Sequence, residues 1–270
     1  MAILALGRPA DRLILWPSTD RRDSGTAVRR ALPFAGGSLE VLVARSARRP
    51  PELYVLRFYG NADRADEWIA DEAKSLGREV AVEAWGVNYP GYGGSTGPAS
   101  LQGIAAAAVA AYDALKREAG VRPIVVVGTS LGTTAALHVA AERAVAGVVL
   151  HNPPALRELI VGEHGWWNLW LLAWPISRQV PSALDSVANA RRVHAPAVFV
   201  LSALDEVVPH RYHRLIYDAY GGQKEALVRP RAHHNTPLDD EAATAYDAAV
   251  GRLLRRAVAP PADPPATRAF

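Results

Sequence analysis

The regular alternation of two kinds of segment constrains the fold of this chain more than any other feature. Short runs rich in apolar β-branched residues alternate with longer, alanine-rich segments. This alternation is typical of a mostly parallel sheet covered by helices, and it predicts an α/β fold with eight strands and helices on both faces of the sheet. We expect Ser100 and Asp63 to cap two of the helices. The expected strands are residues 12–16, 39–44, 53–58, 80–84, 124–127, 147–150, 197–201 and 226–228, and the expected helices are residues 64–76, 101–119, 131–144, 210–220 and 240–258.

Length and composition indicate one domain that needs no covalent cross-link. The chain has 270 residues, 50% of them hydrophobic, and no cysteine. A single domain of this size buries enough surface to be stable alone, so we expect residues 1–259 to form it and the proline-rich residues 260–270 to be a disordered tail. The lack of cysteine excludes disulfides, thiolate metal sites and a cysteine nucleophile, and it fits a cytoplasmic protein.

Charge and hydropathy argue against several classes of partner. The net charge is +3, and the arginines occur as scattered pairs with acids nearby rather than as a basic stripe, so we expect no nucleic-acid partner. Residues 1–6 are apolar but too few, and lack a charged leading region, for a secretory signal. The most apolar aromatic stretch, residues 166–176, is too short to span a bilayer. A transient contact with a membrane surface stays open.

The sharpest motif lies in the segment VVVGTSLGTTAALHVA, residues 125–140, between an apolar strand and a helix. It contains Gly128-x-Ser130-x-Gly132. A nucleophilic serine on a tight strand-to-helix turn has strained backbone angles, and side chains at the two glycine positions would collide with the turn. The motif predicts that Ser130 is a nucleophile, and the alternative is a serine in an ordinary glycine-rich turn.

A serine hydroxyl needs a base, and the base needs an acid that orients it. Both follow in the order serine, acid, histidine, each just after a later expected strand. The segment AVFVLSALDEVVP places Asp205 and Glu206 after one strand, and EALVRPRAHHNTP places His233 and His234 after the last. The spacing alone leaves the choice within each pair open.

Four segments together make the chain similar to the α/β-hydrolase-fold serine hydrolases over about residues 53–256. They are FYGNAD, NYPGYGGSTG, GTSLG, and LSALDEVVP with HHNTP. The chain most resembles the small intracellular esterases, thioesterases and depalmitoylase-like members of that family. The resemblance implies a Ser130–His234–Asp205 triad, because the family's acid lies in an S-x-x-D-x-x-V-P loop and its histidine precedes an asparagine.

The same resemblance implies an oxyanion hole, which needs two backbone amides aimed at the developing negative oxygen. One is the amide of Leu131, after the nucleophile. The other is expected from Asn61, on the loop after the strand at residues 53–58. Family members usually have His-Gly where this chain has Tyr59-Gly60. We therefore consider Tyr59 a pocket residue, together with His151 at the end of another strand.

Residues 152–187 interrupt the alternation and are expected to form a cap over the site. Within them Trp166, Trp167 and Trp170 belong to a nearly all-apolar stretch that should bury most of its area. One hypothesis is a hydrophobic roof for an acyl chain. The alternatives are core packing, or docking onto a lipid surface or partner chain.

The combined features predict a serine hydrolase that cleaves a carboxylic ester or thioester of a small-molecule or acyl substrate, without a cofactor. An amidase or peptidase using the same triad is the enzymatic alternative. A non-catalytic binding protein that kept the fold is the alternative of another class. No group of aspartate or glutamate ligands accompanies His210, His213 and His233 in the sequence, so we expect no metal site.

Overall fold

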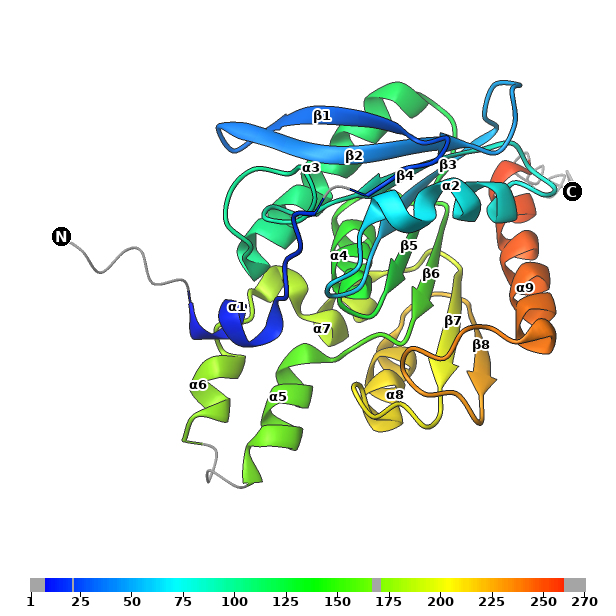
Figure 1. The fold of residues 1–270 in the computed structure, drawn as a ribbon. Helices are drawn as coiled ribbons and strands as arrows, with labels where there is room; N and C mark the ends of the chain where they lie inside the picture. The colour runs from blue at the N-terminus through cyan, green and yellow to red at the C-terminus, as the bar shows by residue number, and fades with distance from the viewer. Residues whose placement is uncertain (1–7, 21, 167–170, 260–270) are drawn as a thin grey trace, which may run out of the picture.

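The computed structural model describes residues 8–20, 22–166 and 171–259, and it contains one eight-stranded sheet (Figure 1). The strand order is β1-β2-β4-β3-β5-β6-β7-β8. Both antiparallel pairings involve β2, and the remaining neighbours pair in parallel. The carboxyl ends of the parallel strands therefore meet at one edge of the sheet. The strands are β1 (Val28–Phe34), β2 (Gly37–Arg45), β3 (Leu53–Phe58), β4 (Val82–Val87), β5 (Ile124–Thr129), β6 (Gly147–His151), β7 (Ala197–Ser202) and β8 (Lys224–Arg229).

Helices cover both faces of this sheet and bury its apolar strands in two cores. Alternate residues of the central strands belong to one core or the other, because successive side chains of a strand point to opposite faces. Helices α3 (Leu101–Ala119), α4 (Leu131–Glu142), α7 (Ser186–Arg192) and α8 (His210–Ala219) contribute to the first core. Helices α2 (Ala65–Leu76) and α9 (Asp240–Val258) contribute to the second. The predicted α/β architecture is confirmed.

The N-terminal region differs from the sequence prediction. Residues 12–16, expected as a strand, belong mostly to helix α1 (Pro9–Ile14), which begins with a proline in its first turn and carries Asp11 there. Both features favour a helix start. The missed strand, β1, has a largely exposed or half-exposed surface and contains Arg29 and Arg30. It is an edge strand that pairs with β2, so its sequence lacks an apolar run.

The two predicted helix caps have opposite outcomes. The Ser100 hydroxyl accepts a hydrogen bond from the Gly103 amide at 3.0 Å, which confirms this cap. Asp63 is not a cap, because α2 begins after Arg64 and no side chain caps it. The Asp63 amide instead closes a turn onto the Gly60 carbonyl at 3.4 Å.

The tryptophan-rich segment folds into short helices, of which α6 lies beside α1 (Figure 1). These are α5 (Leu156–His164), α6 (Ala173–Ser177) and the 3-10 helix η2 (Ser182–Leu184). Helix α6 buries its small residues, Ala173 and Ser177. Its larger neighbours point outward, and Trp166 and Trp174 are 70% and 56% exposed. The expectation that this stretch is buried is therefore wrong for Trp166 and Trp174. Trp167 and Trp170 lie outside the described residues.

None of the helices in the described part of the chain combines the length and the apolar composition that crossing a bilayer requires.

Candidate active site

The turn between β5 and α4 holds Ser130 in a strained conformation. Ser130 has φ 48° and ψ −122°, a positive φ that non-glycine residues rarely adopt. A Cβ on Gly128 would lie 2.6 Å from the Thr133 Cα, and one on Gly132 would lie 2.3 Å from the Phe58 carbonyl oxygen. Both glycines are therefore required by close backbone contacts. The turn places Ser130 at the carboxyl edge of the sheet.

A histidine and an acid from later strands converge on this serine. The His234 Nε2 lies 3.0 Å from the Ser130 Oγ, and the His234 Nδ1 lies 2.6 Å from the Asp205 Oδ2. The Asp205 side chain is fully buried and the His234 side chain is 8% exposed. The three predicted residues thus form one continuous hydrogen-bonded line.

The loop after β7 holds the Asp205 carboxylate in its charged form. Burial alone would raise the pKa of Asp205, but contacts with His213 and His234 and a hydrogen bond from the Val208 amide outweigh it and keep this pKa well below its usual range. The Val207 and Val208 amides donate to Oδ1 at 2.9 and 2.7 Å, which leaves Oδ2 for His234.

The alternative acid and base form a separate, exposed pair. The His233 Nδ1 lies 3.0 Å from the Glu206 Oε2, and both side chains are 60% exposed. The geometry therefore favours Asp205 and His234 over Glu206 and His233 for contact with the serine. His210 and His213 lie near each other, but no cluster of three potential metal ligands occurs in residues 8–20, 22–166 and 171–259.

Asn152 supports the histidine loop, a role that the sequence analysis did not assign. It follows β6 with φ 47°, a conformation that asparagine tolerates better than most residues. Its Nδ2 donates to the His234 carbonyl at 3.1 Å, and its Oδ1 accepts from the Ser202 amide at 2.9 Å. Its signal in the sequence was an amide residue at the end of a predicted central strand.

The loop after β3 faces the nucleophile. A Cβ on Gly60 would lie 3.6 Å from the Ser130 Cβ. Ala62 has φ 65°, so the Gly60–Asp63 turn contains a non-glycine residue in the left-handed region. Within the described ranges, the amides of Asn61 and Leu131 donate to no protein acceptor. These are the two amides that were expected to hold an oxyanion.

Tyr59 lies buried at the start of this loop. It is 2% exposed, and its hydroxyl donates to the Glu72 Oε2 at 2.8 Å. The second core and α2 enclose the ring, so its role as a pocket residue stays a prediction. Burial, and then the neighbouring Glu72 charge, raise the pKa of Tyr59, so the phenol stays protonated.

Arg57 joins the ends of the two strands that lead into the expected oxyanion donors, β3 and β5. Its Nη2 donates to the Thr129 Oγ1 at 2.9 Å, next to the nucleophile, and its Nη1 donates to the Phe58 carbonyl at 2.7 Å. Its Nε and Nη2 also bind Glu72, and its guanidinium lies 4.5 Å from the Tyr59 ring centroid. Arg57 was not predicted as a site residue because it lies within an otherwise apolar strand.

Comparison with known proteins agrees with this architecture. Residues 55–189 match the model of the α/β-hydrolase fold. The chain belongs to the α/β-hydrolase-fold family. It is 31% identical over 174 residues to an uncharacterized protein of Mycobacterium tuberculosis. This alignment covers 61% of this chain and 59% of that protein. It is 27% identical over 214 residues to α/β hydrolase domain-containing protein 17C of Homo sapiens, covering 73% of this chain and 61% of that protein.

The chain thus spans about three fifths of the length of these two relatives. Among solved structures, Est1E from Butyrivibrio proteoclasticus, bound to ferulic acid, matches with a TM-score of 0.69 at 16% identity. That match covers 86% of this chain and all of Est1E. At this identity the likeness concerns the fold alone.

This α/β-hydrolase-fold protein also has cavities on the α2 and α9 face of its sheet. His151 lines one of about 200 Å³ with Arg57 and Tyr246, behind the nucleophile turn. The His151 side chain thus faces this cavity, while its carbonyl accepts from the Ser130 amide at 2.8 Å. Burial, and then the charges of Arg57 and Arg229, lower the pKa of His151 to about 3.

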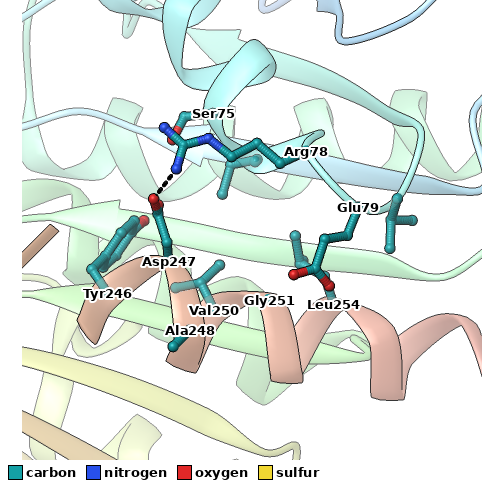
Figure 2. A pocket seen from close by; sticks show the side chains of 11 residues that line it. Ser75, Arg78, Glu79, Tyr246, Asp247, Ala248, Val250, Gly251 and Leu254 are labelled. Carbon is teal, nitrogen blue, oxygen red and sulfur yellow. Dashed lines mark hydrogen bonds and ion pairs between the residues drawn. The ribbon is translucent and has the colours of Figure 1, made fainter. Parts of the chain in front are cut away.

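A neighbouring cavity lies between α2 and α9, where Figure 2 shows Arg78 and Asp247 directed at each other as an ion pair. Its lining contains none of the three hydrogen-bonded site residues.

Proposed function

We propose that this protein is a serine hydrolase that cleaves a carboxylic ester or thioester through an acyl-enzyme intermediate. The observation that carries the proposal is the continuous line from the Ser130 Oγ through the His234 ring to the Asp205 Oδ2, with distances of 3.0 and 2.6 Å. A buried acid bonded to one histidine nitrogen fixes the tautomer whose other nitrogen accepts the serine proton.

In the acylation step, the Ser130 oxygen attacks the substrate carbonyl carbon while the His234 Nε2 takes the serine proton. The negatively charged Asp205 stabilises the imidazolium that forms. When the tetrahedral intermediate collapses, the bond to the leaving oxygen or sulfur breaks and His234 returns the proton to the leaving group. The acyl group then remains on Ser130.

In the deacylation step, His234 takes a proton from a water molecule, whose oxygen attacks the acyl carbon. Collapse breaks the bond to the Ser130 oxygen, returns the proton to it, and releases the carboxylic acid. The amides of Asn61 and Leu131 have no protein acceptor within the described residues, and we assign them to the negative oxygen in both steps.

Active-site labelling tests this proposal directly. The intact mass of the protein is measured before and after treatment with a fluorophosphonate probe. Peptide mapping then locates the adduct. We expect a single adduct, located on Ser130, and none in Ser130→Ala. A protein that remains unlabelled, with correct circular dichroism, would support the non-catalytic binding alternative. Cytoplasmic location and a small acyl substrate remain proposals of the same kind.

A further inference from the structure

A segment that precedes the residues matched by the family model bonds to the loop after β3. We call residues 9–18, which contain α1, the N-terminal strap. The family model matches residues 55–189. Figure 1 shows α1 beside α6, with the following chain passing upward along the molecule. Ala10 and Leu15 of the strap are buried in the first core, so the segment is packed rather than loosely attached.

The strap holds the side chain of Asn61, whose amide we assign to the oxyanion. The Asn61 Oδ1 accepts from the Trp16 amide at 2.9 Å and from the Tyr92 hydroxyl at 3.1 Å. The Asn61 Nδ2 donates to the Ile14 carbonyl. Two of these three partners belong to the strap, and together they fix the plane of the side-chain amide.

The strap is itself anchored at points away from Asn61. The Asp11 Oδ1 accepts from the Leu101 amide at 2.8 Å, at the first turn of α3. The Ala10 amide donates to the Gln179 Oε1 at 3.2 Å. At the other end, the Ser18 carbonyl accepts from the Gly93 amide at 2.8 Å. These hydrogen bonds fix the strap, and through it the Asn61 side chain, to the rest of the domain.

The loop that Asn61 occupies needs such support. Ala62, the next residue, is held at φ 65°, and a non-glycine residue in this region persists only when its surroundings impose it. Without the side-chain bonds, the turn can relax and move the Asn61 amide. Oxyanion donors act only when their geometry is set before the reaction.

We propose that the N-terminal strap is a positioning element of the active site, which fixes the Asn61 oxyanion donor through its side chain. The strap does not contact the reacting atoms. The proposal rests on the proposed hydrolase function and adds a part of the chain that lies outside the segment matched by the family.

Two substitutions at the same helix end test the strap. Asp11→Ala and Ser100→Ala each delete one side-chain acceptor from the first turn of α3, but only Asp11 belongs to the strap. We expect both to lower the thermal midpoint, because each removes an acceptor of first-turn amides. Asp11→Ala should also lower kcat for p-nitrophenyl acetate about tenfold with little change in KM. Ser100→Ala should keep kcat within about twofold of wild type.

Binding of phenylboronic acid gives a second measurement, since its Ser130 adduct places an oxygen in the oxyanion hole. Asp11→Ala should weaken this binding by about the same factor as kcat, whereas Ser100→Ala should not. Equal effects of the two variants on kcat and on boronate binding would overturn the proposal.

Asn61→Ala tests the centre of the arrangement, because it keeps the backbone amide and removes all three side-chain bonds. We expect kcat to fall about 100-fold. Tyr92→Phe removes one of the three bonds and should have a smaller effect in the same direction. Unchanged kcat and boronate binding in Asn61→Ala would also refute the positioning role of the strap.

Fluorophosphonate labelling of wild type separates failure of this proposal from failure of the proposed function. If wild type is labelled but the variants keep its kcat and boronate binding, only the role of the strap is refuted. If wild type is not labelled, the proposed hydrolase function is refuted.

Discussion

The two halves of the candidate site are built on different principles. The half formed by the loops after β5, β7 and β8 presents Ser130, Asp205 and His234, which we expect to act through their own side chains. The half formed by the loop after β3 is expected to act through the backbone amide of Asn61. A side chain that performs chemistry leaves a motif in the sequence. A backbone donor can be supplied by any residue, so what matters there is the set of contacts that holds the loop.

The supports of the two halves differ in the same way. The Asp205 Oδ1 is held by amides two and three residues away, those of Val207 and Val208. The histidine loop of the same half has a distant support, because Asn152 bonds to it from 82 positions earlier. In the other half, Asn61 is held by Trp16, 45 positions earlier, and Arg57, on the strand before the loop, reaches Thr129, 72 positions later. The acid loop is therefore held by its neighbours in the sequence, whereas the oxyanion loop depends on tertiary structure.

Removing the nucleophile or the base should have the largest effect and would test the first half directly. Ser130→Ala and His234→Ala should each lower kcat for p-nitrophenyl acetate about 10⁵-fold or more, because each removes a group without which the others cannot act. His233→Ala, which alters the exposed neighbouring pair, is the matched control and should remain near wild type. Substantial activity in His234→Ala, or greater damage in His233→Ala, would show that the base is assigned to the wrong histidine.

Asp205→Asn should have the next largest effect, about 10⁴-fold on kcat, since an amide favours the wrong histidine tautomer. Glu206→Gln changes the neighbouring acid by the same chemistry and should be nearly silent. Kinetics of both variants at one pH, with circular dichroism as a folding check, decide the comparison. If the Glu206 variant were the more damaged, the acid would have to be reassigned.

These three residues also mark how far the sequence allowed prediction. The fold is confirmed, and the structure brings Ser130, His234 and Asp205 together as expected, while their catalytic roles stay predictions. They were readable because strand, turn and residue type agree within a few positions. Asn152 and Arg57 were missed because a supporting role depends on which distant backbone groups lie within reach.

The errors have physical reasons of the same kind. The apolar residues of 12–16 suggested a strand, but Pro9 and Asp11 start a helix just before them. The tryptophans were expected to be buried on hydropathy alone. Trp174 is exposed because the small residues of α6 make its inner contacts, and Trp166, outside α6, is exposed as well. Periodicity in so short a segment does not settle which side faces inward.

Thr129→Val sharpens the comparison at the second half. It keeps the shape of the side chain and removes the hydroxyl that accepts from Arg57. We expect kcat to fall about tenfold with KM nearly unchanged, because Arg57 would no longer join the ends of β3 and β5, which lead into the two expected donors. Thr129→Ser retains the acceptor and should restore most of the activity. Equal activity of the valine and serine variants would limit Arg57 to a role in stability.

His151→Gln should have the smallest effect on activity and a clear effect on the pH dependence of stability. The pKa of His151 in the folded protein is lowered to about 3, whereas the pKa of a histidine in an unfolded chain is about 6.5. The unfolded chain therefore binds a proton that the folded chain does not, and the free energy of unfolding falls as the pH drops from ~6.5 towards that folded value. Glutamine cannot take up this proton.

Urea unfolding at about pH 7 and about pH 4 measures this contribution. His151→Gln should lose less stability than wild type between the two conditions. A parallel loss in both proteins would show that His151 is not the residue responsible.

The anchoring of the strap has a consequence for how the protein is made. Ala10 bonds to Gln179, 169 positions later, and Asp11 bonds to Leu101, 90 positions later. Contacts of such separation form late, because the intervening chain must be ordered first. The strap is synthesised before the segments that hold it, and it must therefore wait for most of the domain. A nascent chain could align its serine, acid and histidine and still remain a poor catalyst until the strap has docked.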